Sequence, residues 1–105
     1  MTTFNELRKA NQTRQKEWDP TDAITIEYRG NELAGEVGEL CNLIKKVARE
    51  RIGLRGTRAT KEQLAEELRD VIICADLIAM DLGIDLDPKD KFNATSEKYG
   101  LKTRL

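Results

Sequence analysis

Two stretches of the chain, LAGEVGEL at Leu33–Leu40 and LAEELRDV at Leu64–Val71, decide the fold because they follow the same pattern. In each stretch, two carboxylates stand three positions apart among apolar residues at helical spacing. Residues three or four apart lie on one side of an α-helix, so each acidic pair shares a side. Two such helices packed together would gather four carboxylates, and this arrangement predicts a cation site between them.

The positions around each helix place the acidic pairs at the edges of two apolar stripes. The first stripe comprises Leu33, Val37, Leu40, Ile44 and Val47, and the second comprises Leu64, Leu68, Val71, Ala75, Ile78 and Leu82. Glu36 and Glu39 follow one edge of the first stripe, with Glu32 beside them. Glu67 and Asp70 follow the matching edge of the second stripe. If the stripes pack face to face as an antiparallel pair, the two acidic edges meet.

The rest of the chain also predicts helices, and no segment alternates as a strand does. Four helices are expected: from the capping box at Thr3 to about Trp18, from about Ile26 to Ile52, from the cap at Thr60 to about Leu82, and from Pro88 to about Tyr99. Gly83 is expected to end the third helix, and Asp87 to cap the fourth. The first helix has a weak apolar stripe, which is typical of a peripheral helix or a subunit contact. The sequence therefore predicts an all-α bundle of about four helices in a single domain, residues 1–105.

Composition excludes several classes of function. Lys and Arg number 18 against 19 Asp and Glu, a net charge of −1, so a nucleic-acid or polybasic membrane binder is not expected. The chain has no histidine, which excludes histidine-based triads and zinc sites. Its two cysteines, Cys41 and Cys74, are too few for a disulfide framework. No signal region or membrane-length apolar run is present, so we expect a soluble cytoplasmic protein.

The predicted cation site suits a hard metal ion. Clustered carboxylates repel one another by about 4 kcal/mol per pair at 4 Å and an effective dielectric near 20. All-oxygen ligands favour Mg²⁺, or alternatively Mn²⁺, over zinc. A single Glu-x-x-Glu is typical of a solvated helix face, but two copies beside two apolar stripes favour a site. Gly35 and Gly38, which are costly inside a helix, indicate close approach of another helix or a ligand.

These motifs resemble those of the all-α, MazG-like nucleotide pyrophosphohydrolases. That family's signature is Glu-x-x-Glu, a variable gap and Glu-x-x-Asp, which reads here as Glu36–Glu39 and Glu67–Asp70. The flanking residues and Gly83–Leu86 also look like the family, and the similarity covers roughly Trp18–Tyr99. The resemblance implies a helical bundle completed as a homodimer or a dimer of dimers. It also implies Mg²⁺-dependent cleavage of a nucleoside triphosphate to the monophosphate and pyrophosphate.

The resemblance also assigns roles to residues. Glu36, Glu39, Glu67 and Asp70 become the metal ligands, and Glu36 or Glu39 would also act as the catalytic base that orients the attacking water. No histidine base is needed, because a metal cluster lowers the pKa of a bound water.

Four further residues are candidates for substrate binding. Lys46 is either a phosphate contact or an ion-pair partner, and Trp18 either stacks on a base or, as the preferred interpretation, packs in the core. Lys91 and Lys98 share a helix face and would contact phosphates. Similar proteins carry Lys, Asn and Arg along this face, whereas this chain has Lys91, Thr95 and Lys98. This departure weakens bidentate phosphate recognition, and the alternative is a solvated basic face.

Two alternatives remain open from the sequence. The same site would serve phosphoribosyl-ATP or dUTP instead of another (d)NTP. The chain would otherwise be a catalytically silent helical partner or regulatory module that uses its apolar faces to bind a protein.

Overall fold

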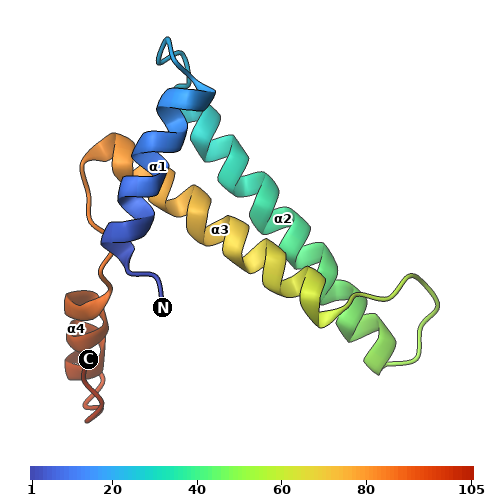
Figure 1. Ribbon diagram of the computed structural model, residues 1–105. Coiled ribbons are helices and arrows are strands. Elements are labelled where there is room, and N and C mark those ends of the chain that lie inside the picture. The colour runs from blue at the N-terminus through green and yellow to red at the C-terminus, as the bar shows by residue number, and fades with distance from the viewer.

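The computed structural model describes residues 1–105 as four α-helices without a strand (Figure 1). The helices are α1 (Phe4–Trp18), α2 (Ile26–Arg51), α3 (Lys61–Leu82) and α4 (Lys89–Lys98). The all-α prediction is confirmed. None of the helices combines the length and apolar character that crossing a membrane requires.

The helix ends follow from local side-chain chemistry. Thr3 and Glu6 form the predicted capping box at α1, in which each side chain accepts from the other residue's backbone N–H. Thr60 and Gln63 form the same arrangement at α3. Gly83 ends α3 in the left-handed conformation, with φ 68°, which glycine adopts without a steric penalty.

The start of α4 differs from the prediction by one residue. The helix begins at Lys89 with Pro88 as its N-cap, so Pro88 is not the first helical residue. The Asp87 carboxylate nevertheless accepts a hydrogen bond from the Lys89 backbone N–H at 3.0 Å. The prediction of Asp87 as the N-cap was therefore wrong, although its carboxylate still binds a backbone N–H at the start of the helix.

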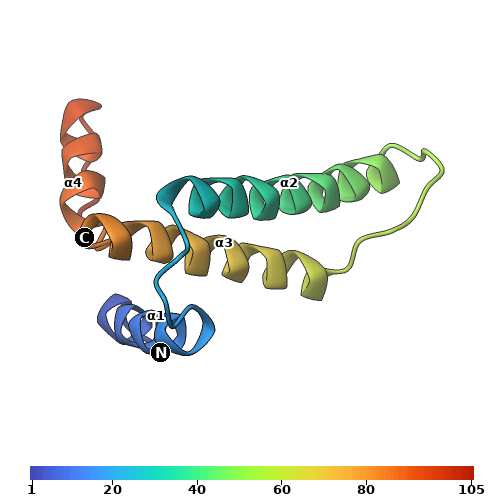
Figure 2. The same cartoon turned by 90° about the horizontal axis from the view of Figure 1, so that it is seen from above.

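α1 and α2 pack on opposite sides of α3. α2 and α3 lie side by side and antiparallel, joined by the loop at residues 52–60 (Figure 1). α1 packs against α3 on the other side, so α3 lies between α1 and α2 (Figure 2). The chain turns after α3, and α4 lies apart from the other helices without a packing contact (Figure 1 and Figure 2).

The core of the chain is small and lies on α3. Its buried apolar residues are Cys74, Leu77 and Ala79. The residues of the two predicted stripes are only half-buried or are exposed, and the exposed ones are Val37, Ile44, Val47, Leu68 and Leu82. The prediction that the stripes form the core was therefore wrong. α1 and α2 both pack against α3, and the residues buried there are Cys74, Leu77 and Ala79.

Polar side chains hold α1 and α2 onto α3. Asp76 is 1% exposed and accepts from Arg8 Nε at 3.0 Å and from Asn11 Nδ2 at 2.9 Å. Arg29 of α2 is also buried, and it donates to Asp81 of α3 and to Gln15 of α1. Because buried polar groups need partners, these two networks specify how the helices cross.

The molecule is extended for its length. Its radius of gyration is 17.3 Å, whereas a compact domain of about 100 residues has a radius of about 13 Å. Apolar side chains at Ile44, Leu68 and Ile72 are each about half exposed. One copy of the chain therefore leaves a large part of its apolar surface uncovered.

Candidate functional site

The antiparallel packing of α2 on α3 brings three of the four predicted metal ligands together. Carboxylate oxygens of Glu36, Glu67 and Asp70 all lie within 4.8 Å of one another. Glu36 comes from α2, and the other two come from successive turns of α3. This acidic cluster forms where the sequence placed it, at the edges of the two helices.

Glu39, the fourth predicted ligand and a predicted catalytic residue, lies outside this group of three. It nevertheless lies near Glu67, since its negative charge and a side-chain hydrogen bond both help to raise the pKa of Glu67. Its side chain is exposed. Glu39 therefore lies at the solvent side of the acidic cluster.

Glu67 is the most perturbed carboxyl group. A side-chain hydrogen bond to Glu36, partial burial, and the charges of Glu39 and Glu36 raise its pKa from 4.5 to about 7. Its Oε2 atom is buried and has no hydrogen-bond partner. A buried acceptor without a partner is costly, and a bound cation would satisfy it.

The donor set fits a hard divalent ion. The acidic cluster offers only carboxylate oxygens, the ligand type that Mg²⁺ and Mn²⁺ prefer. No lysine or arginine neutralises it, since the ion pairs of the chain are Arg8–Asp76, Arg29–Asp81 and Arg58–Glu50. The carboxylates are thus free to bind a cation.

A pocket of about 410 Å³ opens beside the acidic cluster. Glu36 and Asp70 line one part of it, and Ile73, Cys74 and Leu77 form an apolar wall from α3. A ligand held at the acidic cluster would therefore extend along α3 into this pocket.

Trp18, at the end of α1, also lines the pocket. The preferred core interpretation of this residue was wrong, since its side chain is 75% exposed. Trp18 is the last residue of α1, and no other part of the chain covers its side chain. The indole is therefore available to a ligand in the pocket.

Of the three lysines predicted to bind substrate, one lies on the helix that carries Glu36 and two lie on α4. Lys46 lies two turns beyond Glu39 on α2, half-buried and without an ion pair. Lys91 and Lys98 lie on α4, which does not contact the other helices. Lys98 Nζ instead lies 5.5 Å from the centre of the Tyr99 ring. Within one chain the structure does not bring the α4 lysines to the acidic cluster.

Gly35 and Gly38 flank Glu36 on α2. A Cβ atom added at either position would have no other atom within 4 Å. No helix of the same chain makes the close approach that these glycines indicated. The space beside them is open to a ligand or to another copy of the chain.

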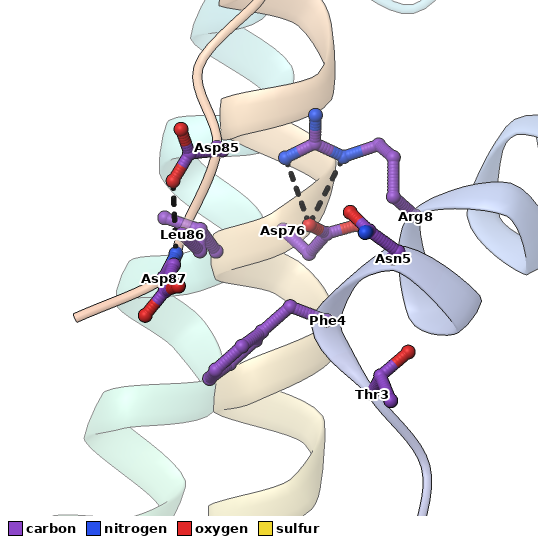
Figure 3. Close-up of a pocket in the computed structure, with 8 residues that line it drawn as sticks. All are labelled: Thr3, Phe4, Asn5, Arg8, Asp76, Asp85, Leu86 and Asp87. Atoms are coloured by element: carbon purple, nitrogen blue, oxygen red, sulfur yellow. Dashed lines mark hydrogen bonds and ion pairs between the residues drawn. The ribbon is translucent and has the colours of Figure 1, made fainter. Parts of the chain in front are cut away.

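A second cavity of about 410 Å³ lies between the start of α1 and the segment that follows α3 (Figure 3). Phe4, Asp85 and Asp87 line it, and Arg8 crosses it to pair with Asp76. Asp85 accepts from the Asp87 backbone N–H. The Arg8 guanidinium also donates through Nη2 to the Ile84 carbonyl at 2.6 Å. This cavity is separate from the acidic cluster.

Sequence reasoning missed two features of the site region. Arg14 and Glu32 line the pocket, although the sequence placed Glu32 only beside the acidic edge. The Asp76 network was also missed. Asp76 interrupts the apolar run at residues 71–80, and a charge inside such a run is a signal that a partner exists elsewhere in the chain.

No protein-family model, curated protein or solved structure matches this chain. The resemblance to the MazG-like pyrophosphohydrolases therefore depends on the acidic motifs and their context.

Proposed function

We propose that the protein is a Mg²⁺-dependent nucleoside triphosphate pyrophosphohydrolase of the MazG-like type, which releases a nucleoside monophosphate and pyrophosphate. Its substrate would be a canonical or aberrant (d)NTP in the cytoplasm. The observation that carries the proposal is the acidic cluster, in which Glu36, Glu67 and Asp70 lie within 4.8 Å without a cationic partner. The adjoining pocket with Trp18 supports a nucleotide as the ligand.

In this proposal each carboxylate has a defined role. Glu36, Glu67 and Asp70 hold the ion, and Glu39 joins them from the solvent side. When bound, Mg²⁺ supplies charge neutralisation for the phosphates and lowers the pKa of a water. Glu36 or Glu39 accepts a hydrogen bond from the attacking water and so orients it toward the phosphorus atom.

The remaining residues would bind the substrate. Trp18 offers its exposed face for stacking on the base, an interaction worth about 1–3 kcal/mol. Lys46 lies on the acidic side of α2 and would contact a phosphate oxygen. Lys91 and Lys98 would reach the phosphates from α4 of a second copy, since α4 does not contact the other helices of its own chain. The enzyme would therefore act as a homodimer or a dimer of dimers.

The test is pyrophosphate release by the purified protein with Mg²⁺ over a panel of nucleotides that includes dUTP and phosphoribosyl-ATP. Asp70→Asn and Glu67→Gln should each lower kcat by at least about a hundredfold, because each removes a ligand charge. Glu66→Gln is the matched control, since Glu66 is exposed on the same helix and outside the acidic cluster. Activity that survives Asp70→Asn contradicts the proposal.

One observation favours the silent helical partner as a second candidate: Lys91 and Lys98 lie on α4, which does not contact the other helices, so a single chain does not bring these predicted phosphate contacts to the acidic cluster. A thermal melt with and without Mg²⁺ or Mn²⁺ separates the two candidates. An ion at a hundredfold excess over its Kd stabilises the folded state by about 2.7 kcal/mol. The silent module predicts no change in melting temperature.

A further inference from the structure

Glu32 is the one carboxylate of the pocket that the proposed metal site does not use. It lies one turn before Glu36 on α2, half-buried, and it lines the pocket. It is outside the group whose oxygens lie within 4.8 Å of one another. Its position is on the pocket side of the acidic cluster, toward Trp18.

The hydrogen-bonding capacity of Glu32 is largely unused. Its only donor is the Cys74 thiol, with Sγ 3.7 Å from Oε1, and a thiol is a weak donor. Arg29 also lines the pocket, but its guanidinium donates to Asp81 and Gln15. No lysine or arginine forms an ion pair with Glu32. Glu32 thus presents free acceptor lone pairs to whatever occupies the pocket.

The residues that line the pocket limit which nucleotide bases can bind there. A nucleotide whose phosphates lie at the acidic cluster would have its base in the pocket, which the apolar wall of α3 and Trp18 line. The edge of such a base meets Glu32, which can accept hydrogen bonds but cannot donate them. Cytosine and adenine carry an exocyclic amino donor where uracil, thymine and hypoxanthine carry a carbonyl oxygen.

We propose that Glu32 is a specificity-determining residue that selects cytosine and adenine nucleotides over those whose base has a carbonyl oxygen in place of the amino group. This inference rests on the proposed function, because it takes the phosphates to lie at the acidic cluster. An amino group donates to the carboxylate, whereas a carbonyl oxygen would place two acceptors against each other and leave both unsatisfied. Sites built around such a hydrogen bond reject the mismatched analogue by at least about tenfold.

Binding can be measured without hydrolysis, because Trp18 is the only tryptophan of the chain and lines the pocket. The α,β-imido analogues of dCTP and dUTP, in the presence of Mg²⁺, are titrated against its fluorescence. The analogues of dATP and dITP form a second pair that differs in the same amino-to-carbonyl exchange. We expect the amino-bearing member of each pair to bind at least about tenfold more tightly.

Glu32→Gln should reduce each ratio to about threefold or less, because an amide can face either group with a donor or an acceptor. Glu27→Gln is the control: Glu27 is an exposed residue in the first turn of the same helix and should keep the wild-type ratios. Equal affinities within the pairs for the wild-type protein, or ratios unchanged by Glu32→Gln, overturn the inference.

The inference and the proposed function can fail separately. Pyrophosphate release without an amino preference overturns the selectivity of Glu32 and leaves the hydrolase intact. An amino preference that depends on Glu32, without pyrophosphate release from any triphosphate, supports the binding role and overturns the hydrolase. No fluorescence change with any analogue overturns the inference by itself.

Discussion

Glu67 makes the stability of the metal-free protein depend on pH. Its pKa is raised from 4.5 to about 7 by the hydrogen bond to Glu36, by partial burial and by the nearby charges. Between these values the folded state retains a proton that the unfolded chain has released. The stabilisation is therefore fully present below about pH 4.5 and is lost as the pH rises through about 7.

We predict that Glu67→Gln flattens this part of the pH profile. Melting temperatures in the presence of EDTA at pH 5, 6, 7 and 8 should fall more steeply for the wild-type protein than for the variant. Glu66→Gln, an exposed neighbour, should retain the wild-type slope. Parallel profiles for the wild type and Glu67→Gln would show that the two carboxyl groups do not share a proton.

The two cysteines should differ in reactivity. Burial and the charge of Glu32 raise the pKa of the Cys74 thiol from 9.0 to about 11, and the side chain is 7% exposed. Cys41 is exposed. Because the thiolate is the nucleophile, iodoacetamide at pH 8 should alkylate Cys74 at least about a hundredfold more slowly than Cys41. Peptide mapping by mass spectrometry measures both rates, and comparable rates would contradict the prediction.

The buried residue of α1 is the polar Asn11, and Asn11 and Arg8 join α1 to Asp76 of α3. Asp76→Ala would leave the Arg8 guanidinium and the Asn11 amide without their shared acceptor. We expect a loss of about 3 kcal/mol in the free energy of unfolding, because breaking a buried pair leaves unpaired polar groups. Urea denaturation measures the loss, with Asp90→Ala on exposed α4 as the control. A loss below about 1 kcal/mol would mean that apolar contacts hold α1 in place.

The exposed apolar surface of the whole molecule predicts an oligomer. Leu68 and Ile72 are each 51% exposed and continue the face of α3 that carries Asp76 and Ala79. α1 covers this face at Asp76 but does not reach the first half of α3. A second copy would cover the remainder and reduce the exposed apolar area.

Sedimentation equilibrium at micromolar concentration should therefore show dimers or tetramers. Ile72→Glu should shift the protein to monomers, because it would bury a charge in the interface. Leu54→Glu, at an exposed apolar residue in the loop after α2, should leave the assembly unchanged. A wild-type protein that sediments only as a monomer contradicts the prediction.

The helices and the three clustered carboxylates could be predicted from sequence because both depend on near neighbours. The Thr3 and Thr60 caps act within three residues, and Gly83 ends α3 through its own backbone. The spacing of Glu67 and Asp70 places them on one side of α3 whatever surrounds the helix. Glu36 joins them in the acidic cluster because α2 packs against α3 as an antiparallel neighbour.

Other features depended on contacts between residues far apart in the chain. The crossing of α1 over α3 is specified by Arg8 and Asn11 meeting Asp76, which follow from no local pattern. Which part of α3 is buried depends on that crossing, and Trp18 is exposed beside the pocket. The sequence alone therefore determined the four helices and their acidic edges, through local spacing and capping. The tertiary structure decided the core, the pocket and the separation of α4 from the acidic cluster, because these depend on how distant side chains pack.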